Sequence, residues 1–305
     1  MTIMNILCYL NIFLIKIRRR WLFVFSRFYS DKIYLQKMFP LRLGYLLNLD
    51  NPQTFNEKLQ WMKLYDRNPA YTQMVDKIES KKFVASIIGE EHIIPTIAVY
   101  DSVDKIDFDM LPNRFVLKCS HDSGGLIICK DKNVLNKTAA LKKLKKALKK
   151  DYYLRIREWP YKNVKPRILA EAFIEDKKDG ELRDYKFFCF NGKPSKLLLA
   201  SGRFGGDNTL CLDFFDMNFN HLDLVEYNHP NSEVLPHKPH HFEEMKSLAE
   251  KLSTGIPQVR VDFYEANDHI YFGEMTFFDM GGYRQIHPDS WDLEWGKLID
   301  LPKKD

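Results

Sequence analysis

The sequence predicts an α+β (mixed α/β) fold in which helices are interleaved with antiparallel β-hairpins. Two observations lead to this prediction. Segments that alternate apolar and polar residues come in pairs around turn-forming residues, which is typical of hairpins, and stretches with helical periodicity separate them. The 305 residues, of which 45% are hydrophobic and 14% aromatic, are sufficient for a large core in one multi-lobed unit or in two domains.

The first thirty residues differ from the rest of the chain. A mostly apolar run over 3–15 is followed by a basic cluster and then by the apolar, aromatic run 21–25. The apolar run is shorter than a membrane-spanning helix requires, and it lacks the basic start and cleavage site of a secretory signal. We expect residues 1–50 to form a helical extension. Residues 1–30 of it either contact the inner surface of the cytoplasmic membrane or pack on the main body with solvated arginines.

The first half of the main body shows helix and strand signals in alternation. Thr54 is a predicted N-cap, because Glu57 follows three residues later and completes a capping box. Further helices are expected at 76–88 and 138–151, and strands at 93–100, 115–119, 126–129 and 168–174. The lysine-rich face of helix 138–151 is expected to be solvated, which is the usual state of such a face.

The second half is dominated by hairpin signals. Strands at 184–190 and 194–200 flank the turn dipeptide Asn191-Gly192, a strong hairpin sequence. A helix at 242–252 then leads into a closing hairpin over 258–276.

The closing hairpin brings two carboxylates together. A turn centred near Asp268 places Asp262 opposite Glu274, with Arg260 on the same face and apolar side chains on the other. Two neighbouring carboxylates repel each other unless a cation joins them, and a hard divalent cation such as Mg²⁺ is a natural ligand. The alternative is a salt-bridged sheet surface on which Arg260 neutralises one acid.

A second candidate site follows the strand 115–119. Lys118 ends this strand, and a short loop containing Ser123, Gly124 and Gly125 comes directly after it. A lysine offers a point charge, and glycines allow backbone N–H groups to approach phosphate oxygens closely. The loop has neither Walker A nor Rossmann spacing, and Ser-Gly-Gly is also an ordinary hairpin turn.

The order of these features along the chain resembles that in the ATP-grasp enzymes. The features are, in turn, Lys77, Lys118 with its glycine loop, the strand 168–174, the segment 184–186 and the closing hairpin. The resemblance is closer to their TupA-like family, which occurs in cell-surface polysaccharide gene sets. It covers roughly residues 51–301.

The resemblance implies an ATP-grasp fold, in which two α/β lobes clasp ATP between antiparallel sheets. The domains that it implies are the helical extension 1–50, a pre-ATP-grasp region 51–111, a small lobe with the glycine loop at 112–175, and a C-terminal lobe with the metal hairpin at 176–305.

The resemblance also implies roles for individual residues. Those implied to bind ATP are Lys77, Lys118, Ser123, Gly124, Gly125, Glu171, Phe173 and Ile174. Asp262 and Glu274 are similar to the Mg²⁺ ligands, and Arg260 and Lys186 to the catalytic cations. Many ATP-grasp enzymes have Asn two residues after the metal-binding Glu, whereas this chain has Thr276, which places a second Mg²⁺ in question.

The implied activity is that of an ATP- and Mg²⁺-dependent carboxylate–amine ligase, which forms an acyl phosphate that an amine then attacks. We expect it to act in capsular or teichuronopeptide-like polysaccharide biosynthesis. Its partners would be an acidic polysaccharide or its precursor and an amino compound, and no nucleic acid. Arg183, Arg203 and His287 are candidate contacts for the acidic substrate. The five cysteines form no CxxC pair, which fits a reduced, cytoplasmic chain.

Two other functions remain open from the sequence. The triplet Asp107-Phe108-Asp109 fits the DxD metal motif of glycosyltransferases that use nucleotide-sugars, although such triplets are frequent and this one lies in a polar loop. A non-catalytic nucleotide-binding or scaffold protein is less favoured, because both candidate metal acids and both lysines are present.

Overall fold

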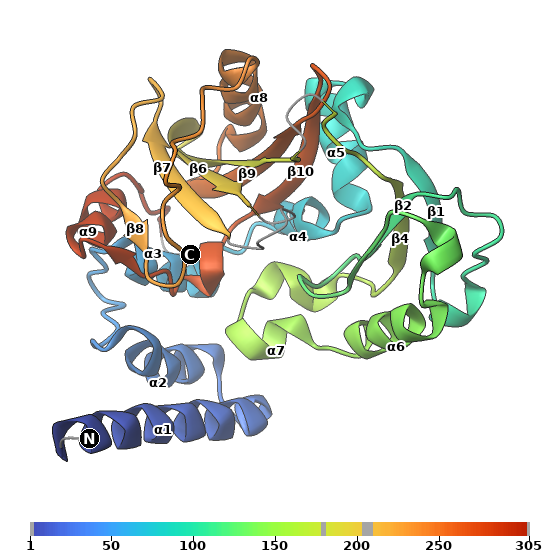
Figure 1. Cartoon of the computed structure of the whole chain (residues 1–305). Helices are drawn as coiled ribbons and strands as arrows, with labels where there is room; N and C mark the ends of the chain where they lie inside the picture. The colour runs from blue at the N-terminus through green and yellow to red at the C-terminus, as the bar shows by residue number, and fades with distance from the viewer. Residues whose placement is uncertain (1–2, 178–180, 203–209, 304–305) are drawn as a thin grey trace.

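The computed structural model describes residues 3–177, 181–202 and 210–303, with side chains in the first helix described from Ile12 onward. It confirms the α+β class. A four-stranded and a five-stranded antiparallel sheet lie on opposite sides of the main body, and helices surround them (Figure 1).

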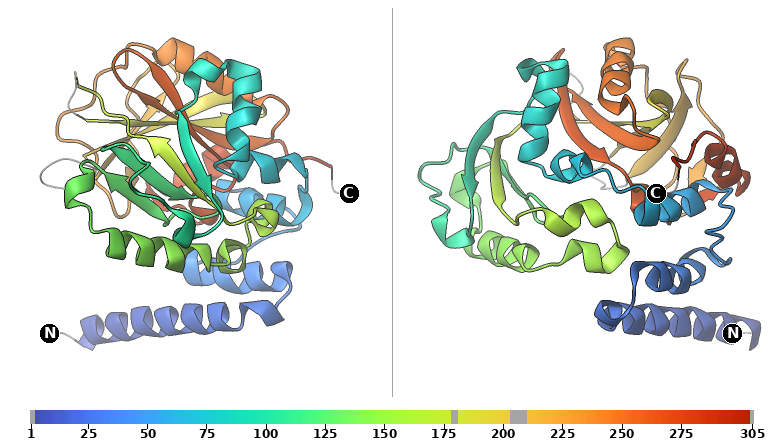
Figure 2. Two further views of the ribbon diagram at one scale, coloured as in Figure 1. Left: turned by 90° about the vertical axis from the view of Figure 1, so that its right-hand side faces the viewer. Right: turned by 180° about the vertical axis from the view of Figure 1, so that it is seen from behind.

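Two helices form the N-terminal extension, α1 (Ile3–Val24) and α2 (Asp31–Leu43). They lie at one edge of the molecule, with α1 outermost (Figures 1 and 2). The inner face of α2 is buried with Tyr283 in a small apolar cluster of its own. Among the described residues, no helix is both long enough and apolar enough to cross a membrane.

Three helices precede the first strand: α3 (Phe55–Tyr65), α4 (Ala70–Val75) and α5 (Glu79–Ile88). The predicted capping box is confirmed, because the Thr54 side chain accepts from the Glu57 N–H while the Glu57 carboxylate accepts from the Thr54 N–H. The helix predicted from residue 76 begins only at Glu79. Asp76 instead forms a turn, in which its carboxylate accepts from the Ile78 N–H at 2.9 Å.

The four-stranded sheet is antiparallel throughout. Its strands, in order across the sheet, are β1 (Thr96–Tyr100), β4 (Ile168–Ala172), β2 (Phe115–Cys119) and β3 (Leu126–Cys129). The predicted bounds of β2 and β3 are confirmed, whereas β1 starts three residues later than predicted and β4 ends two residues earlier.

Helix α6 (Lys137–Leu148) buries Leu144 and Ala147 in the core of this sheet. It ends before the predicted residue 151, because Asp151 caps a further short helix, α7 (Tyr152–Ile156), which the sequence pattern did not reveal.

The five-stranded sheet is also antiparallel. Its strands, in order, are β10 (Ile270–Thr276), β9 (Gln258–Glu265), β5 (Asp184–Phe190), β6 (Lys193–Ser201) and β7 (Cys211–Asp216). Helix α8 (Phe242–Ser253) packs against it, and β7 is a strand that was not predicted. The remaining elements are the two-stranded sheet of β8 (Val225–Glu226) and β11 (Ile286–His287) and helix α9 (Ser290–Gly296). Short 3₁₀ helices occur at Ser26–Phe28, Glu90–His92, Val103–Lys105, Lys132–Val134, Trp159–Asn163 and Asp279–Gly281.

The register of the closing hairpin is confirmed where it matters for the site. Asp262 pairs with Glu274 and Arg260 with Thr276, as a turn centred near residue 268 predicts. Nearer the turn the register slips by one residue at Gly273, so the predicted symmetry ends there. A Cβ on Gly273 would lie 3.1 Å from the Asp262 carbonyl oxygen, and this crowding explains why a glycine occupies the bulge.

Candidate active site

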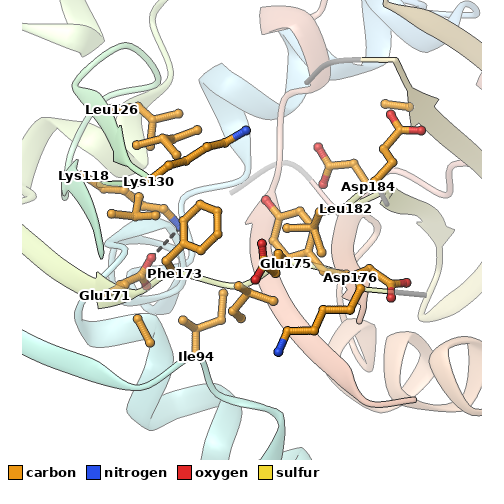
Figure 3. Close-up of a pocket in the computed structure, with 18 of the residues that line it drawn as sticks. Ile94, Lys118, Leu126, Lys130, Glu171, Phe173, Glu175, Asp176, Leu182 and Asp184 are labelled. Atoms are coloured by element: carbon orange, nitrogen blue, oxygen red, sulfur yellow. Dashed lines mark ion pairs between the residues drawn. The ribbon is translucent and has the colours of Figure 1, made fainter. Parts of the chain in front are cut away.

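A cavity of about 600 Å³ lies between the two sheets (Figure 3). Both sheets contribute to its walls, with β2, β3 and β4 on one side and β5, β6 and β9 on the other. Four of the residues predicted to bind ATP line it: Lys118, Glu171, Phe173 and Ile174. The cavity therefore brings part of the predicted nucleotide site together.

The alternation of β2 and the register of β4 explain how Lys118 and Glu171 meet. Phe115, Leu117 and Cys119 are buried in the core, so the alternate residue Lys118 faces the cavity. Glu171 pairs with Val116, the neighbour of Lys118 on the same face of β2. The Glu171 carboxylate then accepts from Lys118 Nζ at 2.6 Å, an ion pair drawn in Figure 3.

The same carboxylate binds a second lysine that the sequence did not reveal. Lys81 Nζ on α5 lies 2.7 Å from the other oxygen of Glu171. Burial raises the pKa of Glu171, but Lys118 and Lys81 lower it more, so the net shift is downward. Two cations thus share one anion here, Lys118 in the cavity wall and Lys81 in a smaller pocket next to it.

The glycine loop lies beside the cavity rather than in its walls. Lys77 Nζ donates to the Asp122 carbonyl at 2.8 Å and so links the turn that precedes α5 to the loop. Gly125 donates its N–H to the Asp122 carboxylate at 2.9 Å, and a Cβ on it would lie 2.5 Å from Cys119 Sγ. In this conformation Gly125 is therefore required by packing, and its N–H is already bonded. Ser123 hydrogen-bonds the Tyr152 hydroxyl, and Ser123, Gly124 and Gly125 are not among the described residues that line the cavity.

The two carboxylates of the closing hairpin are held by cations. Arg260 donates to both oxygens of Asp262, at 2.7 Å each, and to Glu274 at 3.1 Å. Lys186, which β5 places opposite Asp262, lies 2.5 Å from the same carboxylate. Thr276 accepts from Arg260 at 3.1 Å through its hydroxyl. The salt-bridged arrangement considered from the sequence is present here.

These contacts still fit a divalent cation chemically, because both side chains offer the carboxylate oxygens that Mg²⁺ prefers. Asp262 is buried, whereas the Glu274 side chain is 41% exposed and is the more accessible of the two. Its enclosed position raises the pKa of Glu274, but the charges of Lys77, Arg260 and Lys186 lower it more. Arg260 and Lys186 thus supply the positive charge that a metal ion would supply.

Two further carboxylates belong to this cluster, Asp184, which lies 3.0 Å from Lys186, and Asp279, which was missed by the sequence reading. Asp279 is fully buried and accepts from both Arg260 and Arg284. Burial raises the pKa of Asp279, but these two arginines outweigh it and bring the value to about 2. The available signal was its position three residues after the end of β10 and before Gly281 and Gly282, which have positive φ of 67° each.

A buried lysine and glutamate lie next to this cluster. Lys63 on α3 is fully buried and donates to the carbonyls of Ile156 and Gly281 at 2.8 and 2.6 Å. Burial lowers the pKa of Lys63 to about 7. Burial also raises the pKa of Glu158 to about 8, with the negative charges of Asp279 and Glu274 adding to the shift. Both shifts favour the neutral form of the side chain, and burial is the main cause of each.

Other predicted residues have different positions. Arg183 Nε lies 4.0 Å from Glu181, a residue of the cavity wall, whereas His287 is on the exposed edge of β11. Arg203 lies outside the described residues. The aspartates of the DxD triplet face a turn, since the Asp107 carboxylate accepts from the Asp109 N–H at 2.9 Å.

Comparisons with known proteins found one family model and a number of similar solved structures. A family model described as TupA-like ATPgrasp matches residues 57–300. Solved structures that are similar include a D-alanine–D-alanine ligase from Helicobacter pylori (14% identity, 82% of this chain and 70% of that chain, TM-score 0.42). Others are the D-cycloserine synthetase DcsG (13%, 75% and 71%, 0.41) and the ATP complex of a Bacillus anthracis D-alanine–D-alanine ligase (14%, 72% and 55%, 0.37). No curated protein sequence matches this chain.

Proposed function

The chain belongs to the TupA-like ATP-grasp family, and we propose that it is an ATP- and Mg²⁺-dependent carboxylate–amine ligase that acts through an acyl phosphate. The observation that carries the proposal is the opposite charge of the two sides of the cleft. At the four-stranded sheet, Lys118 and Lys81 share the one carboxylate of Glu171. At the five-stranded sheet, three cations share five carboxylates, of which Asp184 lines the cavity: the cations are Arg260, Lys186 and Arg284, and the acids are Asp184, Glu226, Asp262, Glu274 and Asp279. A nucleotide triphosphate with its cation is complementary to both.

Residues of the cavity supply the contacts that ATP requires. The apolar side chains of Phe173 and Ile174 suit the adenine ring, and Lys118 suits the phosphates. Lys81, which lines a smaller pocket next to Lys118 and Glu171, adds positive charge on the same side. Asp262 and Glu274 would hold Mg²⁺, which neutralises phosphate charge when bound. Lys77, which contacts the glycine loop, would follow that loop if it closes over the triphosphate.

The proposed reaction has two balanced steps. A substrate carboxylate oxygen attacks the γ-phosphorus of ATP, so the bond to the β,γ-bridging oxygen breaks and ADP leaves. An amine then attacks the acyl phosphate carbon, inorganic phosphate leaves with the bonding electron pair, and the nitrogen loses a proton. Such transfers depend chiefly on positioning and charge neutralisation, which Arg260 and Lys186 would provide beside the transferred phosphate.

The substrates that we propose are an acidic cell-surface polysaccharide, or its precursor, and an amino compound. This assignment rests on the family resemblance. Arg183, close to the cavity wall, is the candidate contact for the acidic group that the described structure favours.

The test is ATP turnover by the purified full chain with Mg²⁺ and a panel of uronic and amino acids. We expect ADP and phosphate to be released only when a suitable carboxylate is present. Replacing Glu274, the more accessible of the two candidate metal ligands, by Gln should lower this turnover roughly 10²–10³-fold. Asp109→Asn, which changes the exposed aspartate of the DxD triplet, is the control and should leave turnover unchanged. Consumption of a nucleotide-sugar without ATP turnover would instead establish the glycosyltransferase alternative.

A further inference from the structure

A second cavity, of about 330 Å³, lies between the N-terminal extension and α7. Its walls come from α1, α2 and α7, and eight residues line it: Lys16, Arg19, Arg20, Phe23, Tyr34, Met38, Arg42 and Arg155. Five of these side chains are cationic and none is acidic. It is thus a basic cavity, separate from the cleft between the sheets.

Among the described residues that line the basic cavity, none is an acid that could neutralise its cations. Burial lowers the pKa of Arg42, and the positive charges of Arg19 and Arg155 lower it further. Arg42 Nε is buried and has no hydrogen-bond partner among the described residues. The acid at the start of α2, Asp31, is engaged instead by Arg157 at 3.4 Å and Arg67 at 3.3 Å. Arg19 and Arg42 are partly buried, and the other three cations of the cavity are exposed, so the cavity is suited to an anion that neutralises this cluster.

The outer face of α1 is apolar and exposed. Phe13 is 61% exposed, Trp21 and Val24 are each 59% exposed, and Phe25 is 43% exposed. At the helical rotation per residue, Phe13, Leu14, Trp21 and Val24 fall within one sector of about 100°, and Phe25 follows directly after the last residue of α1. Three other exposed apolar side chains lie outside this sector: Ile12, Ile15 and Phe23. The Trp21 and Phe25 rings are stacked with centroids 5.6 Å apart, so the face presents a continuous aromatic surface.

Cations border this apolar face. By the same rotation, Arg18 falls just beyond one edge of the sector and Arg20 just beyond the other. Arg20 also lines the basic cavity, together with Lys16 and Arg19, which continue around the helix on that side. The cavity therefore opens beside the apolar face. An apolar face bordered by cations is typical of a helix that lies in the plane of a membrane interface.

We propose that α1 docks on an anionic phospholipid bilayer, with its aromatic face at the headgroup–acyl boundary and a lipid phosphate in the basic cavity. A free anion would account for the cavity but not for the adjoining aromatic face. The position of α1 at the outer edge of the molecule leaves this face clear of the main body (Figures 1 and 2). The proposal is independent of the ligase chemistry, although it would place the cleft near a membrane surface.

The lysine-rich helix α6 provides a matched comparison. Lys142 and Lys145 are exposed cations on a helix whose apolar residues face the core, with neither aromatic side chains nor a basic cavity. If charge alone determined membrane binding, the two surfaces would contribute alike. The proposal assigns binding to α1.

The test is flotation of the full chain with vesicles of phosphatidylcholine alone or containing 30% phosphatidylglycerol, without ATP. We expect binding only to the anionic vesicles. The double variant Arg19→Ala/Arg42→Ala should weaken it roughly 10- to 30-fold, since each cation near the surface contributes about 1 kcal/mol. Trp21→Ser/Phe25→Ser should weaken it at least as much. Lys142→Ala/Lys145→Ala should change it less than about fivefold.

The outcomes separate the sources of the anion. Vesicle binding that survives both α1 variants, or that the α6 variant abolishes, overturns the proposal. The absence of vesicle binding also overturns the proposal. If, in addition, millimolar inorganic phosphate raises the urea midpoint of the wild type but not that of Arg19→Ala/Arg42→Ala, the basic cavity is a site for a soluble anion. The exposed positions Trp21 and Phe25 can be changed without unfolding the core, and an unchanged urea midpoint confirms this. ATP turnover is not the readout, so failure here does not bear on the ligase.

Discussion

The two sheets on either side of the cavity differ in the balance of their charged side chains. On the four-stranded sheet, Glu171 binds both Lys118 and Lys81, so cations are in excess. On the five-stranded sheet, Arg260, Lys186 and Arg284 are shared among five carboxylates, so acids are in excess. The metal–triphosphate complex that we propose as ligand carries both charges, an anion that suits the basic side and a cation that suits the acidic side.

Solvent exposure also differs among these charged groups, and it distinguishes groups that stabilise the fold from groups that a ligand can reach. Asp279 is fully buried between two arginines, whereas the Glu274 side chain is 41% exposed and Lys118 is 21% exposed. Full burial between two arginines indicates a structural role for Asp279, whereas partial exposure makes Glu274 and Lys118 available to a ligand. Variants of the buried groups should therefore lose stability, and variants of the accessible groups should lose ATP turnover.

The largest effect should come from Asp279→Asn, and it should be an effect on stability. This change leaves Arg260 and Arg284 buried with one negative charge fewer, and breaking such a pair costs about 3–5 kcal/mol. Urea unfolding followed by circular dichroism measures the loss. Asp101→Asn, in an exposed pair with Lys165, is the control and should leave the urea midpoint unchanged. Equal midpoints for the two variants would show that the buried cluster does not stabilise the fold.

The next effect should come from Lys118→Met, and it should be an effect on ATP use. Glu171 keeps Lys81 as a partner, so stability should change little, while turnover falls roughly 10²–10³-fold. Steady-state ADP release measures the fall. Lys130→Met is the matched control, because Lys130 lines the same cavity outside the ion-paired cluster. A similar fall in both variants would mean that the cavity responds to total charge rather than to this lysine.

The contrast between the two sides also explains what the sequence could reveal. Alternation and turn residues are local signals, and they predicted β2, β3, β5 and β10 together with the pairing of Asp262 with Glu274. Lys81 lies on a helix ninety residues before its partner Glu171, and only tertiary packing brings them together. A local pattern cannot show such a pair.

The acidic side was harder to predict for the same reason. Asp279 lies three residues after the end of β10, but its partner Arg284 reaches it only because the intervening glycines turn the chain back. The bulge at Gly273 did have a local signal, since glycine within a strand often marks one. The sequence thus indicated the groups that strand pairing brings together better than those that loops and helices add.

A third, smaller effect should appear in the pH dependence of stability. The pKa of Glu158 is raised from 4.5 to about 8, so between pH 5 and 7 the folded chain keeps a proton that the unfolded chain releases. Stability should therefore decrease as pH rises through this range, by about 1 kcal/mol per pH unit from this group. Above pH 7 the lowered pKa of Lys63 acts in the opposite direction.

Urea midpoints at pH 5.5 and 7.0 measure this effect, and Glu158→Gln should flatten the difference because it removes the titrating group. A pH dependence that is the same in wild type and variant would mean that Glu158 is ionised in the folded chain. The acidic side would then carry its full negative charge.

The smallest effect should come from Thr276, where the acidic side departs from many ATP-grasp enzymes. Thr276→Val removes one acceptor for Arg260 and one donor to Glu274, a loss of roughly 0.5–1.5 kcal/mol. Turnover should fall by no more than about tenfold, because this side already has acids in excess. Thr276→Asn adds an amide oxygen that a metal ion can bind, so half-maximal turnover should need less Mg²⁺. Magnesium titrations of ATP turnover test both variants. If Thr276→Val were as damaging as Lys118→Met, the hydroxyl itself would belong to the metal site, and the excess of acid would not be what holds the cation.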